Sequence, residues 1–303
     1  MSSTVTISSP DGETEAEFVP EANMVCGSLR WRGAELLDAG RGLEAYAQHG
    51  KTMGIPLLYP WANRLAEPSY RVAGVAVALP APDGLYALDP HGLPIHGALP
   101  GRLRWSVQAG SPPDRVAAQL DWSAPELMEL FPFEHQLVYE AELSDGRLTL
   151  ATTLQATGSL PVPVSLGFHP YRRIPGSSRA GWRVSLGAAA RLVLDERMIP
   201  TGEREPLAER ERAFVLGEQS WDDGLAGLDA GEPRFAVTAG DSTVTVTFHE
   251  GFGYAQVYAP PAHDYICFEP MTAPTDALRS GEGLSVVEPG GEYRTCWSVT
   301  VTP

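Results

Sequence analysis

The sequence predicts an all-β protein, a large antiparallel β-sandwich with few short helices. Apolar and polar residues alternate along many short runs, which is typical of strands with one buried face. Turn-forming residues, among them 31 glycines and 27 prolines, are spread between these runs and do not gather in a linker. Helical periodicity is scarce. Many short strands separated by turns favour a sandwich or a related all-β architecture.

Two hairpins carry the clearest strand signal. Apolar residues alternate in residues 137–143 and again in residues 148–154, and Ser144-Asp145-Gly146 stands between the two runs. Asp-Gly between alternating runs predicts a tight hairpin turn, because glycine readily adopts the positive φ that such a turn requires. A second hairpin is expected in residues 235–248, with its turn at Gly240-Asp241.

The remaining elements are predicted from weaker patterns. The β-branched and aromatic run of residues 293–301 predicts a C-terminal strand. Ser123-Ala124-Pro125-Glu126 can cap and start one short helix, which is expected to end before Pro132. Since the chain shows no internal repeat or low-complexity tract, we expect residues 1–303 to form a single β-sandwich domain.

Composition narrows the classes of partner. Lys and Arg number 22 against 38 Asp and Glu, which gives a formal net charge of −16. Such a protein repels phosphate backbones and anionic lipid surfaces, so neither nucleic acid nor a membrane is expected as a partner. A neutral small molecule is fully compatible with this charge. No sequence feature indicates the oligomeric state.

The cysteines and the start of the chain bear on its location. Cys26, Cys267 and Cys296 are odd in number and far apart, without the paired spacing of a zinc site. We expect Cys267 and Cys296 to be buried, reduced thiols in strands. The chain opens without a secretory signal and contains no apolar run of membrane-spanning length. The expected location is therefore the cytoplasm.

Four segments place titratable or hydrogen-bonding side chains among prolines, glycines and aromatic residues. They are Pro56-Leu57-Leu58-Tyr59-Pro60-Trp61-Ala62-Asn63-Arg64, His91-Gly92-Leu93-Pro94-Ile95-His96-Gly97, Gly167-Phe168-His169-Pro170-Tyr171 and Phe268-Glu269-Pro270-Met271-Thr272-Ala273-Pro274. Rigid, irregular segments of this kind are where functional sites are built on a β scaffold.

Together the four segments resemble the aldose 1-epimerase (galactose mutarotase) family, because they match its motifs in order and in approximate spacing. The resemblance extends from about Gly54 to near Thr295. It implies a galactose mutarotase-like supersandwich whose concave sheet face holds a sugar. It also implies a cofactor-free exchange of the α and β anomers.

Anomer exchange requires an acid and a base on opposite sides of one bond. The O1 hydroxyl loses a proton while the ring oxygen O5 gains one, the ring opens, and it recloses on the other carbonyl face. Each positioned proton transfer contributes about 10²–10⁴-fold in rate. By resemblance, Glu269 is the base at O1, His169 is the acid at O5, and His96 donates a hydrogen bond to O5 or a neighbouring hydroxyl.

The resemblance also implies a set of sugar-binding residues. They are Arg64, Asn63, Gln256, Asp223, Trp61 and Tyr171. Of the adjacent Asp222 and Asp223, we favour Asp223 as the site carboxylate. Trp61 and Tyr171, together with Phe168, are expected to line the pocket with their rings.

Three alternatives accompany this interpretation. The histidines and Glu269 could ligate zinc, but a bound zinc would occupy the acid–base pair, so no metal is expected. Arg172 and Arg173 could clamp the anion of a phosphorylated or other anionic hexose, or they could be ordinary surface residues. A non-catalytic carbohydrate-binding protein could use the same fold, although such a protein has no need of an acid–base pair.

Overall fold

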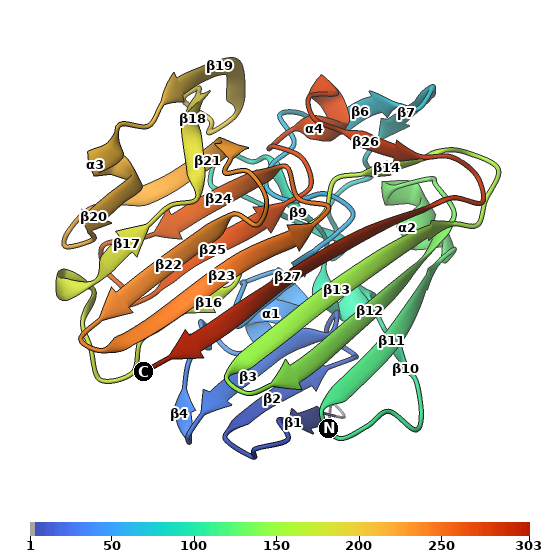
Figure 1. The fold of residues 1–303 in the computed structure, drawn as a ribbon. Helices are drawn as coiled ribbons and strands as arrows, with labels where there is room; N and C mark the ends of the chain where they lie inside the picture. The colour runs from blue at the N-terminus through green and yellow to red at the C-terminus, as the bar shows by residue number, and fades with distance from the viewer. Residues whose placement is uncertain (1–3) are drawn as a thin grey trace.

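A computed structural model describes residues 4–303 of the chain. Two large sheets stacked face to face form most of the molecule, and only a few short helices accompany them (Figure 1). Neighbouring strands in both sheets run antiparallel. The structure therefore confirms the predicted all-β sandwich.

The first sheet has nine strands in the order β10-β11-β12-β13-β27-β23-β22-β17-β20. In this order they span Ser106–Val107, Arg115–Trp122, His135–Ser144, Arg147–Ala156, Glu292–Thr302, Ser242–Glu250, Arg234–Ala239, Arg183–Ser185 and Ala213–Val215. Both predicted hairpins are present as β12–β13 and β22–β23. Gly146 in the first turn has a φ of 65°, as the Asp-Gly signal requires. The predicted C-terminal strand is β27.

The second sheet has the order β19-β18-β21-β24-β25-β15-β5, and β16 pairs with β25 beside β15. The eight strands, with β16 last, span Pro200–Pro206, Ala188–Leu194, Trp221–Leu228, Tyr254–Ala259, Ile266–Met271, Gly167–Phe168, Leu57–Leu58 and Tyr171–Arg172. This sheet carries three of the four motif segments. One of its faces packs on the first sheet, so alternate residues of each strand point to the other face.

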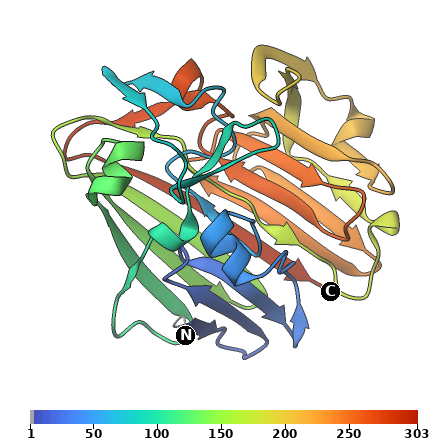
Figure 2. The same cartoon turned by 180° about the vertical axis from the view of Figure 1, so that it is seen from behind.

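A four-stranded N-terminal sheet extends the second layer. Its strands β1 to β4 span Val5–Ser8, Thr14–Val19, Val25–Trp31 and Ala34–Glu35. Isolated bridges join Cys26 to Ile55 and Leu37 to Arg172, which connects this sheet to the residues around β5 and β16. Figure 2 shows these strands with α1 (Leu43–His49) in front of them.

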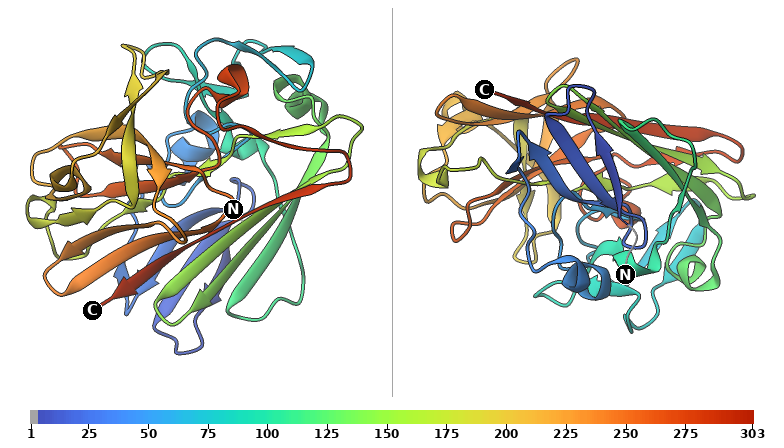
Figure 3. Two further views of the ribbon diagram at one scale, coloured as in Figure 1. Left: turned by 45° about the horizontal axis from the view of Figure 1, so that its top comes forward. Right: turned by 90° about the horizontal axis from the view of Figure 1, so that it is seen from below.

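Short elements gather at one end of the molecule. There α2 (Pro125–Leu130) and α4 (Ala277–Ser280) lie near the hairpin β6–β7 (Figure 3). The remaining paired strands and the helix α3 span Ser69–Val72 and Val75–Ala78 (β6, β7), Tyr86–Leu88 and Pro94–Ala98 (β8, β9), Val162–Val164 and Ser285–Val287 (β14, β26), and Glu209–Arg212 (α3). Two short 3₁₀ turns cover Pro100–Arg102 and Arg179–Gly181. Within residues 4–303, no helix is long and apolar enough to cross a membrane.

The predicted short helix is α2, which ends before Pro132. Its N-cap is Ala124, and no side chain caps it, so Ser123 does not have the capping role that its position suggested. Pro125 instead occupies the first turn, where its missing N–H costs no hydrogen bond.

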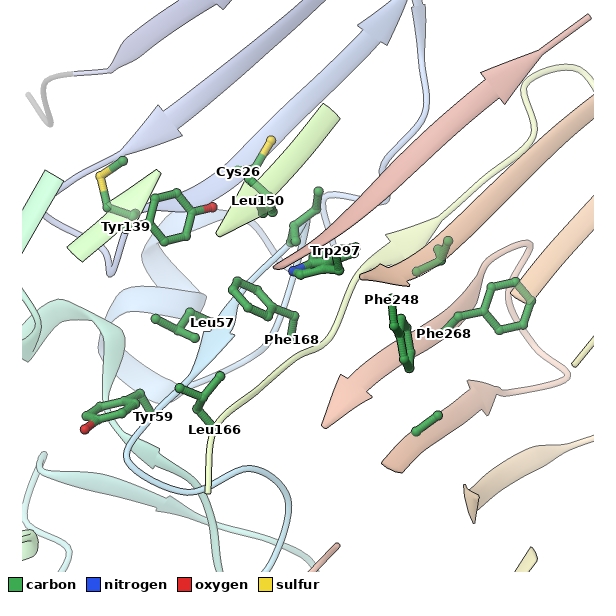
Figure 4. Close-up of a cluster of buried hydrophobic side chains, with 14 of the residues drawn as sticks. Cys26, Leu57, Tyr59, Tyr139, Leu150, Leu166, Phe168, Phe248, Phe268 and Trp297 are labelled. Carbon is green, nitrogen blue, oxygen red and sulfur yellow. The ribbon is translucent and has the colours of Figure 1, made fainter. Parts of the chain in front are cut away.

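Aromatic side chains fill the space between the two large sheets (Figure 4). The ring centroids of Phe168 on β15 and Trp297 on β27 are 5.2 Å apart, and those of Phe268 on β25 and Phe235 on β22 are 5.8 Å apart. These pairs join one sheet to the other.

The three cysteines, which all lie within the described residues, form no disulfide. Cys267 is buried as predicted, whereas Cys296 is only half-buried.

Trp297 provides a test of this packing. It is fully buried, so Trp297→Ala leaves a large cavity between the sheets and is expected to lower the free energy of unfolding by about 3–5 kcal/mol. Urea denaturation measures the loss. Val215→Ala, at an exposed position of the same sheet, is the control and should change stability by less than about 0.5 kcal/mol. A Trp297 variant as stable as this control would contradict the packing described.

Candidate active site

Pairing of β21, β24 and β25 brings three polar side chains to the face of the second sheet that points away from the first. Gln256 lies opposite both Glu269 and Gly224 in the register. Residues directly opposite share a face, and strand residues two apart share it too, so Asp222 and Glu269 are on the same side as Gln256. The amide of Gln256 donates to the Asp222 carboxylate over 2.7 Å.

His169 faces Glu269 from the segment between β15 and β16. Both strands pair with β25, which fixes the segment against the strand that carries Glu269. His169 Nε2 lies 3.3 Å from Glu269 Oε1. The Tyr171 ring stacks on the imidazole with centroids 4.5 Å apart, and its hydroxyl bonds to Thr52 Oγ1 over 2.6 Å. The imidazole is therefore fixed in position between neighbours.

Burial decides the charge of this pair. The Glu269 and His169 side chains are only 2% and 8% exposed. Burial, with the nearby charge of Asp222, raises the pKa of Glu269 well above its usual value. Burial, with the neighbouring His96, lowers the pKa of His169 well below its usual value. Both shifts favour the uncharged forms, a carboxylic acid beside a neutral imidazole.

His96 completes the group of rings around His169. Its ring centroid is 5.7 Å from that of His169. Asn63 and His96 are linked by a backbone hydrogen bond, and the next residue, Gly97, passes so close to Tyr59 that a Cβ there would lie 2.0 Å from the Tyr59 carbonyl oxygen. Burial, followed by the charge of Arg64, lowers the pKa of His96 to about 3. His96 is therefore a neutral donor or acceptor at physiological pH.

Arg64 is held in place by a residue that the sequence analysis missed. Arg64 Nε lies 2.7 Å from Asp89 Oδ2, and the Asp89 side chain is 1% exposed. Asp89 also accepts hydrogen bonds from the backbone N–H groups of His91 and Leu93. Burial alone would raise the pKa of Asp89, but these hydrogen bonds and Arg64 hold it below its usual value. Asp89 thus orients Arg64 and braces the loop leading to His96.

The sequence does contain a signal that Asp89 stabilises a turn. Asp89 is followed directly by Pro90, and Gly92 comes three positions after it. This pattern is typical of a turn in which the aspartate carboxylate accepts hydrogen bonds from backbone N–H groups further along the chain.

The other contacts of Arg64 are to Asn63 and Asp222. Its guanidinium donates to Asn63 Oδ1 over 3.1 Å and comes within 4.0 Å of Asp222 Oδ2.

The structure places Asp222, and not the favoured Asp223, beside these residues. Successive strand residues point to opposite faces, so only one of the two can share the side of Gln256. Asp223 points the other way and lies 2.9 Å from Arg191 Nε. The preference for Asp223 is therefore corrected to Asp222.

Trp61 and Phe168 also lie elsewhere than expected. Both rings are fully buried in the hydrophobic core, where Trp61 meets the edge of Tyr86 and Phe168 packs on Trp297. They support the segments carrying Asn63 and His169 and do not line the site. Among the three expected rings, Tyr171 alone stands beside His169 and Glu269.

The two arginines after the His169 segment do not form a clamp. Arg172 follows Tyr171 on β16 and points to the opposite face, where its side chain is fully buried beside Cys26. Burial lowers its pKa to about 10. Arg173 is half-exposed and comes within 3.8 Å of Asp38. Arg172 is thus neither a surface residue nor a site residue.

A small pocket adjoins the polar cluster. Asn63, Arg64 and Gln256 form its polar end, and Leu192, Met198 and Met271 are among its apolar walls. Glu269, which lies opposite Gln256 in the sheet, and His169 are outside its lining. Separately, His169, Cys267 and Glu269 each offer a metal-ligand atom, and these atoms lie within 4.8 Å of one another.

Comparison with known proteins places this arrangement in a family. The model of the aldose 1-epimerase family matches residues 27–299. The chain is 22% identical over 300 residues to the uncharacterized protein YihR of Escherichia coli, covering 88% of this chain and 89% of that protein.

Two solved structures share the fold. A galactose mutarotase-like protein from Clostridium acetobutylicum superposes with a TM-score of 0.83 at 18% identity, covering 96% of this chain and 93% of that one. Galactose 1-epimerase from Lactobacillus acidophilus superposes with a TM-score of 0.75 at 13% identity, covering 100% and 99%. With the family match over most of its length, the chain belongs to the aldose 1-epimerase family and is a carbohydrate epimerase.

Proposed function

We propose that the protein interconverts the α and β anomers of a free hexose, with Glu269 as the base at O1 and His169 as the acid at O5. The observation that carries this proposal is the buried contact of 3.3 Å between the two side chains. It sits beside a cluster of hydrogen-bonding groups on the open face of the second sheet. No cofactor enters the reaction, since only protons move.

The proton count of the pair fits both stages of the reaction. The neutral acid and imidazole hold one ionisable proton between them, the same number as a carboxylate with an imidazolium. Transfer of that proton from Glu269 to His169 prepares the pair for a cyclic sugar. Glu269 then takes the O1 proton while His169 protonates O5, and the C1–O5 bond breaks.

Ring opening returns the pair to its neutral form. Rotation about the C1–C2 bond then presents the other face of the aldehyde to O5. Reclosure reverses both proton transfers, so that Glu269 protonates O1 and His169 removes the proton from O5. The buried pair is thus in its favoured charge state while the sugar is open.

The surrounding groups supply orientation. Neutral His96 can donate to O5 or an adjacent hydroxyl. Arg64, Asn63, Gln256 and Asp222 offer donors and acceptors to the sugar hydroxyls. Tyr171 holds the His169 ring through stacking.

The charges near the site favour a neutral sugar over a phosphorylated or sulfonated one. Arg64 is already paired with Asp89 and lies near Asp222. An anionic group there would meet two carboxylates for one guanidinium, and Arg172 is buried on the opposite face. A binding protein without catalysis is also disfavoured, because burying Glu269 and His169 costs free energy that sugar binding alone does not require.

Polarimetry tests the proposal directly. Wild-type protein should speed the approach of freshly dissolved α-D-glucose or α-D-galactose to its equilibrium rotation. Glu269→Gln and His169→Asn should each reduce kcat by at least about 10²-fold, because each removes one proton-transfer group. Sugar binding, measured by calorimetry, should fall much less than the rate.

Other results of these measurements would support the alternative functions. Acceleration only with a phosphorylated or sulfonated hexose would overturn the choice of a neutral substrate. Sugar binding without acceleration of any sugar would support a carbohydrate-binding protein. Full activity in either variant would remove that residue from the mechanism.

The pH dependence of kcat/KM tests the charge state of the pair. The one-proton pair is the active form, so activity should fall below the lowered pKa of His169 and above the raised pKa of Glu269. The alkaline limb therefore belongs to Glu269. Since the charge of Asp222 raises that pKa, Asp222→Asn should move the alkaline limb to lower pH. If this variant moves the acidic limb instead, the assignment of the limbs is wrong.

Asp222 and its neighbour form a matched pair of variants. Asp222→Asn removes a half-buried charged acceptor beside Gln256 and Arg64, so kcat/KM should fall at least about 10-fold. Asp223→Asn changes the opposite face of the same strand and should leave kcat/KM near the wild-type value. Steady-state polarimetry of both variants measures the difference. The reverse result would restore Asp223 as the site carboxylate.

A further inference from the structure

Cys267 stands next to the acid–base pair without a part in the proposed reaction. It precedes Glu269 by two residues on β25, so both side chains point to the same face of the sheet. Its register partner is Tyr171, which stacks on His169. Cys267 is a free, fully buried thiol among Tyr171, Tyr265 and the partly buried Tyr258.

The three side chains have the spacing of a metal site. One ligand atom from each of His169, Cys267 and Glu269 lies within 4.8 Å of the other two, and His169 Nε2 is 3.3 Å from Glu269 Oε1. Tetrahedral zinc ligands, at about 2.0–2.3 Å from the ion, lie roughly 3.3–3.8 Å apart. One contact already has this separation, and the sulfur needs to approach by about 1 Å at most to complete the set.

The identity of the ligands selects the ion. Thiolate and imidazole favour zinc or cadmium, whereas magnesium and calcium prefer oxygen ligands. Charge balance also favours a divalent cation. The ion displaces one proton from the Cys267 thiol and one from the Glu269 carboxyl, and His169 binds as neutral imidazole. A divalent cation with two anionic ligands is neutral overall, so the buried cluster gains no net charge.

We propose that His169, Cys267 and Glu269 form a binding site for a thiophilic divalent cation such as Zn²⁺, and that the bound ion inhibits the enzyme in competition with sugar. The ion occupies the lone pairs of both proton-transfer groups, so no acid or base remains for ring opening. The inhibitory part rests on the proposed roles of Glu269 and His169. The binding part rests on the geometry alone.

Cys267→Ala separates metal binding from catalysis. Without added metal, this variant should turn over sugar at about the wild-type rate, because the thiol transfers no proton in the reaction. Zn²⁺ should inhibit the chelator-treated wild type competitively. The variant should require at least about 10-fold more Zn²⁺ for the same inhibition. Cys296→Ala, which removes the half-buried cysteine of β27, is the matched control and should keep wild-type sensitivity.

Cobalt binding provides a readout that does not depend on activity. Co²⁺ added to the wild type and to Cys296→Ala should give a near-ultraviolet thiolate-to-cobalt charge-transfer band, and Cys267→Ala should not. Cys267→Ser replaces the alanine variant if the latter fails to fold. Equal Zn²⁺ sensitivity of wild type and Cys267→Ala, or a cobalt band that persists without Cys267, would overturn the proposal. If no sugar is turned over, the function fails separately, and the band still tests the site.

Discussion

The alternation of side chains along β25 is the constraint on which the site depends. Phe268 packs on Phe235 between the sheets, and this contact forces its neighbours Cys267 and Glu269 to the other face. A slip of one residue would put a carboxyl into the aromatic core and a phenyl ring into the site. The same packing that stabilises the sandwich therefore fixes the position of Glu269, the proposed base. Strands β15 and β16 pair with β25 and bring His169 to it.

Arg64 shows how a β scaffold holds a long, flexible side chain. A guanidinium on an exposed arginine loses considerable rotamer entropy when it binds a ligand. Here the buried carboxylate of Asp89 fixes it beforehand, and the same carboxylate ties down the loop before His96 through two backbone N–H groups. One buried acidic residue thus organises two motif segments. The remaining donors of the guanidinium face Asn63 and Asp222.

Local sequence patterns were sufficient to predict the hairpins of the sheets, but not the position of every side chain. Asp-Gly and Gly-Asp turns between alternating runs predicted both hairpins, because turn chemistry and strand period are encoded within about twenty residues. The motifs singled out Glu269, His169, His96 and Arg64, which the structure brings to one region of the molecule. The choice between Asp222 and Asp223 failed because it depends on the start of β21, and a shift of one residue reverses the face. Trp61 and Arg172 were misplaced for a related reason: their burial is set by packing against segments distant in sequence.

The charge state of Glu269 and His169, the proposed base and acid, follows from their burial and not from residue type alone. In water a glutamate is ionised and a histidine is partly protonated near neutral pH, which suggests a ready-made base and acid. In the structure, burial favours the uncharged form of both groups, so the proposed mechanism requires the bound sugar to stabilise the charged pair. Hydrogen bonds to a bound hexose can supply that stabilisation, since sugar hydroxyls both donate to a carboxylate and accept from an imidazolium. In the proposed mechanism, proton transfer therefore depends on occupancy of the site by the sugar.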